Sequence, residues 1–339
     1  MPFSLKHKLV IGVASSALFD LTESHSVYLT RGVADYRKFQ REHENDVLAR
    51  GIAFGLIQRL LSLNGESEQD RVVEVILLSR NDPDTGLRVL NSMKPNGLDI
   101  TRAVFVSGGN PCIFLKAFDA SLFLSANEHD VKSAISQNLP AGRVFPTEFV
   151  DDDEPELRVA FDFDGVITDD SAELVFQFGG GLKAFQQMEI ENATVVHPLG
   201  PLFPFFAKLA ELHERETALK EKDSKYKRKL RIAIVTARNA PAHERVVRSL
   251  RAWGINVDDA FFLGGIEKAR VLEVYRPHIF FDDQVGHIEG AARVAPCAHV
   301  PFGASNEAAK KLQEFGELIS SAPVVGELNA QGDGEKNKK

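Results

Sequence analysis

Short apolar runs alternate with amphipathic segments along most of the chain. In the second half the expected strands are 157–163, 230–236, 260–263 and 278–281, and the expected helices are 201–216, 241–253, 266–275 and 304–320. Strands that alternate with helices are typical of an α/β fold, in which each helix crosses over to the next strand of a parallel sheet. The pattern therefore predicts a doubly wound parallel sheet.

An acidic run, DDDEPE at 151–156, interrupts this alternation just before a strand. We interpret it as a linker and place a domain boundary near residue 150. The predicted organisation is an α/β domain over 1–150 and a second α/β domain over 151–324. A small cap is inserted at about 169–200, and a disordered tail covers 325–339, where charged and small polar residues have nothing to bury.

The two halves of the chain echo each other in the same order. VILLSRNDP at 75–83 resembles IAIVTARNAP at 232–241, and GLDITRAVFVSGG at 97–109 resembles GINVDDAFFLGG at 254–265. Such internal similarity indicates a duplication. The alternative is that two unrelated doubly wound domains share these patterns.

Only the second half carries acids at its expected strand ends. Ser15 and Ser16 stand where the first half would need carboxylates, and FLSAN at 123–127 replaces FFDDQ at 280–284. The first half is therefore expected to be a degenerate copy, and the second half to be catalytic.

Candidate chemistry gathers where the strands of the second half end. Asp162 and Asp164 are two residues apart and project to the same side, and Gly165 lets the chain turn away. Thr236 ends a second strand, and the pair Asp282 and Asp283 ends a third. Because parallel sheets bind ligands at the carboxyl ends of their strands, these groups should share one rim. Lys268, on a helix after a Gly-Gly turn, could reach the same rim.

This combination suits hydrolysis of a phosphate monoester. Asp162 would attack phosphorus and form an acyl phosphate, and Asp164 would act as general acid and base. Thr236 and Lys268 would hold the phosphate oxygens. Mg²⁺ is the expected cofactor because it combines carboxylates with phosphate oxygens. The expected metal set is Asp162, Asp164, Asp282 and Asp283, with Asp162 and Asp282 as direct ligands and Asp283 acting through water or through a ligand that it contacts.

Substrate contacts are expected from Gly165, Ala237 and Arg238 beside the catalytic groups. In the first half, Asn81 and Asp82 follow the strand that matches the one ending in Thr236. If the first half packs across the catalytic mouth, they would read the sugar or base. The alternative is a simple turn built on Asn-Asp-Pro.

Structural explanations compete with several of these assignments. The Asp162 and Asp164 pair could form a polar turn, and Asp282 and Asp283 could cap a helix. Lys268 could be an ordinary surface lysine. The phenylalanines of the cap are better explained by packing than by base stacking. The histidines His197, His243, His278 and His287 have no metal-ligand spacing and are best explained as structural, with His287 nearest to the acidic pair.

DFDGV (162–166), VTAR (235–238), a lysine after a Gly-Gly turn and FFDDQ (280–284) occur in the order found in the haloacid dehalogenase superfamily. More narrowly, the chain resembles the cytosolic 5′-nucleotidase type I family from about residue 8 to residue 320. The resemblance also rests on SSALFDL (15–21), HEND (43–46), SRNDPDTGLRV (79–89), VSGGNP (106–111) and RPHIFFDDQ (276–284). It implies Mg²⁺-dependent hydrolysis of nucleoside 5′-monophosphates to nucleoside and phosphate.

Composition narrows the partners. A net charge of -8 argues against nucleic acid and favours a small-molecule substrate. The two cysteines have no disulfide or metal spacing, and the apolar run near the N-terminus is too short to span a bilayer, so a cytoplasmic protein without membrane contact is expected. A homo-oligomer is compatible with the sequence. Alternatives to a nucleotidase are a phosphatase for another small ester, such as a sugar phosphate, and a non-catalytic nucleotide-binding protein.

Overall fold

The computed structural model describes residues 4–67, 70–147, 149–303 and 306. The expected helix at 304–320, apart from residue 306, and the expected tail at 325–339 lie outside the described residues. No helix in the described ranges is long and apolar enough to cross a membrane.

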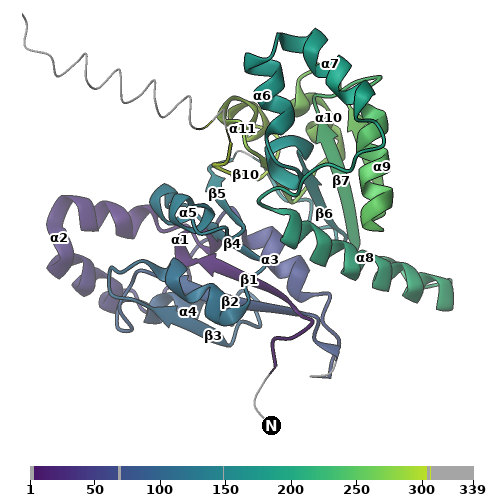
Figure 1. The fold of residues 1–339 in the computed structure, drawn as a ribbon. Coiled ribbons are helices and arrows are strands. Elements are labelled where there is room, and N and C mark those ends of the chain that lie inside the picture. Colours follow the sequence, from purple (N-terminus) through teal and green to yellow (C-terminus); the bar gives the residue numbers. More distant parts are fainter. Residues whose placement is uncertain (1–3, 68–69, 148, 304–305, 307–339) are drawn as a thin grey trace, which may run out of the picture.

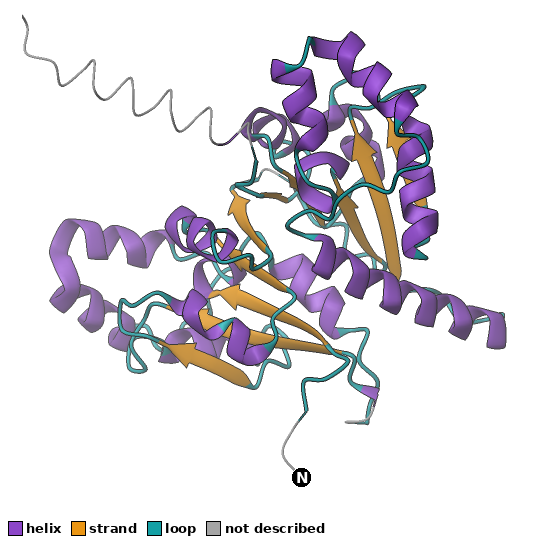
Figure 2. Ribbon diagram, in the orientation of Figure 1, coloured by secondary structure: helices purple, strands orange, loops and turns teal. Residues whose placement is uncertain are grey.

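Ten strands form one mixed sheet in the order β3-β2-β1-β4-β5-β10-β9-β6-β7-β8 (Figures 1 and 2). All neighbouring pairs are parallel except β5 with β10. The predicted α/β class with a mostly parallel sheet is confirmed. The strands are β1 Leu9–Ala14, β2 Val73–Ser79, β3 Arg102–Phe105, β4 Leu122–Ser125, β5 Ala141–Phe145, β6 Leu157–Phe161, β7 Leu230–Thr236, β8 Asp259–Phe262, β9 Ile279–Asp282 and β10 Cys297–His299.

Helices connect the parallel strands, as the alternation of the sequence predicts. The first half contains α1 Ser15–Leu18, α2 Thr22–Glu42, α3 Phe54–Leu61, α4 Leu87–Met93 and α5 Glu128–Ile135, with short helices at Pro111–Phe114 and Lys116–Phe118. The second half contains α6 Ser171–Phe178, α7 Gly181–Glu191, α8 Phe203–Lys222, α9 His243–Trp253, α10 Lys268–Tyr275 and α11 Val285–Ala291, and a short irregular turn at Phe163–Ile167 follows β6.

The two halves have the same strand order. β1 lies between β2 and β4 as β6 lies between β7 and β9, and β3 and β8 form the two outer edges. Each half also inserts helical structure after its first strand, α2 in the first half and α6 with α7 in the second (Figure 1). Both insertions bend at a glycine with positive φ, at Gly32 and at Gly180. This correspondence supports the duplication hypothesis.

Strand register refines the comparison of the halves. Val13 pairs with Leu124 as Phe161 pairs with Phe281, so Val13 corresponds to Phe161. The next residue, Ala14, therefore occupies the position of Asp162, and Ser16 occupies that of Asp164. The expectation that Ser15 replaces a carboxylate is wrong by one residue.

The largest hydrophobic core contains residues from both halves. It extends from β1 and α3 of the first half to β6, α8 and β9 of the second half. At its centre the Phe161 ring stacks on Phe281 at 5.2 Å between centroids and meets the edge of Phe206 at 5.3 Å. The strands consist mainly of apolar residues because both faces of this part of the sheet are covered.

The acidic run that we interpreted as a linker makes ion pairs with both halves. Arg59, on α3, donates two hydrogen bonds to Asp151 at 2.8 and 2.6 Å and a third to the carbonyl of Glu154. Asp152 accepts from Arg158, the second residue of β6, at 2.5 Å. Burial would raise the pKa of Asp152, but hydrogen bonds and the Arg158 charge lower it to about 2. The segment thus ties α3 to β6.

Replacing Arg59 should therefore destabilise the protein. Arg59→Met removes a buried guanidinium and leaves Asp151 unpaired, which should cost about 3 kcal/mol of unfolding free energy. Urea denaturation measures the loss. The control is Arg37→Met, because the Arg37 pair with Asp82 is half exposed at the arginine and should contribute less than ~1 kcal/mol. Equal losses for the two variants would contradict the role of the Arg59 ion pair.

Candidate active site

The candidate site begins where β6 ends. Asp162 follows Phe161 directly, and its backbone N–H donates to the carbonyl of Phe281 on β9 at 2.8 Å. Its Oδ1 accepts a hydrogen bond from the backbone N–H of Phe163 at 2.7 Å. Only 4% of Asp162 is exposed. The carboxylate is therefore fixed at the rim of the sheet with its second oxygen, Oδ2, turned toward neighbouring strands.

Lys268 joins the ends of β6 and β9. Its Nζ lies 2.7 Å from Asp162 Oδ2 and 2.7 Å from Asp282 Oδ2, and all three side chains are buried. The Gly264 and Gly265 turn, with φ of 56° and 88°, allows the chain to start α10 at Lys268. The sequence left the direction of Lys268 open, and the structure directs it into the acidic cluster.

The cluster perturbs each of its members. Burial raises the pKa of Asp162 to about 7, and the charges of Asp282 and Asp164 act in the same direction. Burial would also raise the pKa of Asp282, but Lys268 and His287 lower it below its ordinary value. Burial would lower the pKa of Lys268, whereas Asp162 and Asp282 raise it. A buried lysine held between two acids is a charged group that can neutralise part of an incoming anion.

Asp283, the neighbour of Asp282 in the chain, is the third buried acid of this group. Burial and then the charges of Asp282 and Asp162 raise its pKa well above the ordinary value. Among the described residues, none donates a hydrogen bond to its buried Oδ1. Gly165 packs against this carboxylate, since a Cβ at position 165 would lie 2.6 Å from its carbon, and Gly165 has a φ of 70°. A side chain at position 165 would therefore obstruct the carboxylate.

These residues fit a divalent cation. Oxygen or nitrogen atoms of Asp162, Asp282 and His287 lie within 4.8 Å of one another. Three neighbouring carboxylates face a single lysine, and the unpartnered oxygen of Asp283 lacks the donor that a buried acid needs. Hard cations bind such oxygen-rich groups. The structure thus contains acidic groups that could hold a metal.

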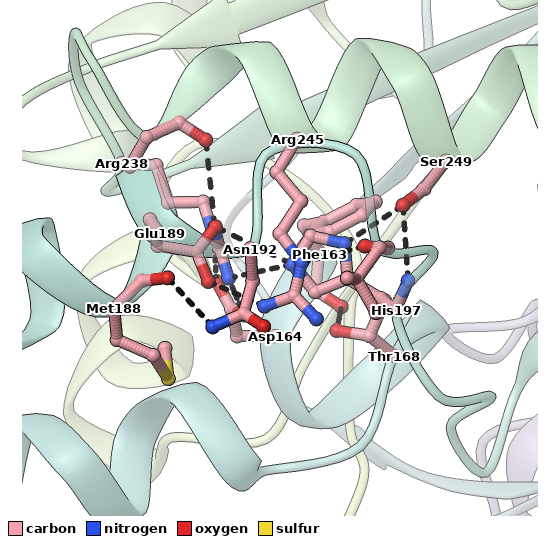
Figure 3. Close-up of polar contacts among 12 residues, drawn as sticks. Phe163, Asp164, Thr168, Met188, Glu189, Asn192, His197, Arg238, Arg245 and Ser249 are labelled. Atoms are coloured by element: carbon pink, nitrogen blue, oxygen red, sulfur yellow. Dashed lines mark hydrogen bonds and ion pairs between the residues drawn. The ribbon is translucent and has the colours of Figure 1, made fainter.

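Asp164 has a different environment. Its two carboxylate oxygens accept from Nε and Nη2 of Arg238, both at 2.7 Å (Figure 3). Its carboxylate is therefore directed at Arg238, and the prediction that Asp164 belongs to the metal set is not supported for its side chain. Arg238 is itself bound by Glu189 of α7.

Thr236 and Ala237 lie between these two groups. Thr236, the last residue of β7, is buried, and its Oγ1 accepts from the backbone N–H of Arg238 at 3.2 Å. Ala237 is exposed at the rim. Together with Gly165 they border the acidic cluster on the side of β7.

Asn81 and Asp82 are not brought to this rim. Because β5 and β10 are antiparallel, the strands of the first half run in the opposite direction to the strands of the second half. The carboxyl ends of β2 and β7 therefore point in opposite directions along the strands. Asn81 accepts from Tyr36 Oη at 2.9 Å, and Asp82 accepts from Arg37 at 2.7 Å. The prediction that Asn81 and Asp82 contact a substrate bound at the Asp162 site of the same chain is therefore wrong.

Sequence patterns missed Glu189, Arg245 and the role of His197. Glu189 is fully buried and bonds Arg245 at 2.8 Å, and His197 lies 3.2 Å from Arg238 (Figure 3). Burial would raise the pKa of Glu189, but His197 and Arg238 lower it to about 2. The available signal was the four-residue spacing of Phe185 and Glu189, which puts an acid on the same face of the helix as an aromatic residue.

The fold and this rim define an α/β protein with a buried, carboxylate-rich group at its strand ends that could bind a cation. A family model described as 5′-nucleotidase matches residues 1–307. The chain is also 33% identical over 305 residues to human cytosolic 5′-nucleotidase 1B. The chain belongs to the 5′-nucleotidase family, which confirms the resemblance seen in its motifs.

The match covers 88% of this chain but 49% of the human protein, so the chain spans about half the length of that relative. No solved structure matches the chain.

Removing the Asp283 carboxyl group should weaken metal binding. Asp283→Asn keeps the size of the side chain but removes one of three clustered carboxyl groups, so affinity for Mg²⁺ should fall about 10–100-fold. Calorimetric titration of the purified protein with MgCl₂ measures this change. The control is Asp153→Asn, in the exposed acidic run, which should leave the affinity unchanged. Unchanged affinity in Asp283→Asn would exclude Asp283 from the metal site.

Proposed function

We propose that this protein hydrolyses nucleoside 5′-monophosphates to nucleoside and phosphate, with Mg²⁺ and an aspartyl-phosphate at Asp162. The observation that carries the proposal is the buried group of Asp162, Lys268 and Asp282 in a chain of the 5′-nucleotidase family. The name of the human relative supports the substrate class. We also infer that residues 151–324 form a haloacid dehalogenase-like unit with a cap at about 169–200, and that residues 1–150 form its degenerate copy.

Magnesium would be held by Asp162 and Asp282, with Asp283 beside them. When bound, Mg²⁺ supplies positive charge that screens the phosphate dianion from the attacking carboxylate. Lys268 adds a second positive charge, 2.7 Å from one oxygen of each acid. With Asp162, Asp282 and Asp283 ionised, the carboxylates exceed the charge of Lys268, and Mg²⁺ would offset this excess.

Asp162 Oδ2 is the candidate nucleophile. It attacks phosphorus in line with the ester oxygen, so a carboxylate–phosphorus bond forms while the phosphorus–ester bond breaks. Asp164, protonated at the start of this step, gives its proton to the departing 5′-oxygen of the nucleoside and becomes the carboxylate that Arg238 binds. In the second step Asp164 removes a proton from water, which attacks phosphorus and returns Asp162 as a carboxylate with release of phosphate. Thr236 and the backbone near Ala237 hold the phosphate oxygens.

The cap would shield these steps from bulk water. α6 and α7 extend from the core next to the rim (Figure 1), and α7 contributes Glu189 to the group around Asp164. Excluding bulk water strengthens the electrostatic contacts at phosphorus. Gly179 and Gly180 separate α6 from α7, and the positive φ of Gly180 and of Gly181, the first residue of α7, sets the bend between the helices.

Phosphate release tests the proposal. Wild-type protein should release phosphate from nucleoside 5′-monophosphates with Mg²⁺ and not with chelator. Asp162→Asn should reduce turnover at least ~10³-fold because the amide cannot act as nucleophile. A panel of 5′-monophosphates, 3′-monophosphates and sugar phosphates measures the specificity.

The matched control is Asp153→Asn, an exposed residue with a φ of 54°, a conformation that asparagine adopts readily. Its turnover should equal that of the wild type. Better turnover of sugar phosphates would retain the mechanism and reject the substrate class. Absence of turnover on every ester would favour a non-catalytic nucleotide-binding protein.

A further inference from the structure

Arg238 is the residue that links the candidate acid/base group to the cap. Its guanidinium binds both oxygens of Asp164 through Nε and Nη2, and it uses its third nitrogen, Nη1, for Glu189 (Figure 3). Its side chain is 2% exposed. A planar guanidinium that binds a carboxylate through two parallel hydrogen bonds fixes the orientation of both groups. The direction of the Asp164 carboxylate therefore depends on where Arg238 lies.

Helix α7 of the cap holds Arg238 in two ways. Glu189 binds it directly, and the ring of Phe185, one helical turn earlier, lies 5.1 Å from its guanidinium carbon. Residues four apart share one face of a helix, so a single face of α7 makes both contacts. On the opposite side, Phe163 of the core lies 5.5 Å from the same carbon. Arg238 is thus held between the cap and the core.

Glu189 also binds a second arginine. Its other oxygen accepts from Arg245 of α9 at 2.8 Å. The four charges therefore alternate in the order Arg245, Glu189, Arg238, Asp164, and the set is neutral. If Glu189 became neutral, Arg238 would keep Asp164, but Arg245 would have no carboxylate partner among the described residues. Breaking a buried ion pair in this way is costly, because the remaining charge must move or draw in water.

We infer that Glu189 is a positioning residue that orients Asp164 through Arg238, so that α7 must be seated on the core for Asp164 to face the leaving group. The inference rests on the proposed function for the role of Asp164. Glu189 touches neither substrate nor metal in this scheme. Replacing Glu189 should therefore affect only the step in which Asp164 transfers a proton. A purely structural residue would affect all substrates alike.

Esters with different leaving groups distinguish these two roles. The nucleoside 5′-oxygen needs a proton as it departs, whereas the nitrophenolate of p-nitrophenyl phosphate departs without one. Glu189→Gln should lower kcat/KM for a nucleoside 5′-monophosphate about 10–100-fold, a part of the effect of general acid catalysis. It should lower kcat/KM for p-nitrophenyl phosphate less than about 3-fold. Equal losses for the two esters, or no loss for either, would overturn the inference.

The matched control is Glu191→Gln. Glu191 lies on the same helix two residues away, is exposed, and bonds only Gln187 at 2.8 Å among its described contacts. Both esters should be turned over as by the wild type. In an Asp164→Asn background, Glu189→Gln should cause no further loss on the nucleotide, because its effect passes through Asp164. A further loss of the same size would assign Glu189 a separate role.

Folding is checked by thermal melting followed by circular dichroism. If Glu189→Gln does not fold, Arg245→Gln replaces it, since this variant releases one oxygen of Glu189 and keeps the contact with Arg238. It should show a smaller loss confined to the nucleotide, and equal losses for both esters would again overturn the inference.

Failure of the proposed function can be recognised separately. If the wild type prefers a sugar phosphate to every nucleotide, the substrate class is wrong, and the comparison of that alkyl ester with p-nitrophenyl phosphate still decides the role of Glu189. If the wild type hydrolyses none of these esters, the proposed function and the inference both fall.

Discussion

The antiparallel pairing of β5 with β10 is the constraint on which the architecture depends. Cys297 pairs with Phe145 and His299 with Arg143, and these few residues join two parallel five-stranded units into one sheet. Because the pairing is antiparallel, the carboxyl ends of the strands in the two units point in opposite directions. The acids of the second half and the polar cluster of the first half are therefore kept apart, although their sequences correspond.

The candidate site is built on buried charge. Lys268 lies between Asp162 and Asp282, and Arg238 lies between Asp164 and Glu189. Each arrangement stores unfavourable desolvation that the opposite charges offset only while the geometry holds. The first group could hold a metal ion. The second connects Asp164 of the core with helix α7. Chemistry and conformation thus use the same kind of interaction on adjacent strands.

Strand ends and motif order were predictable from sequence because they depend on local patterns. Apolar runs predicted β6, β7, β8 and β9 to within two residues, and the residues following them predicted the acidic rim. The relative direction of the two halves was not predictable, since a three-residue strand, β10, sets it by a contact between residues 145 and 297. Glu189 was not recognised either, because its partners, Arg238 and Arg245, are distant in sequence and no local pattern links them.

The shared core gives the first half a structural role that does not depend on acids at its strand ends. Without β5, the strand β10 would become the edge of the sheet and offer unpaired backbone groups to other molecules, a common route to aggregation. The apolar surface that α3 and β1 cover would be exposed as well. A half that covers its neighbour in this way can change the residues at its own strand ends while its strands stay under selection for solubility. On our duplication hypothesis, loss of one set of acids and retention of the scaffold are therefore compatible.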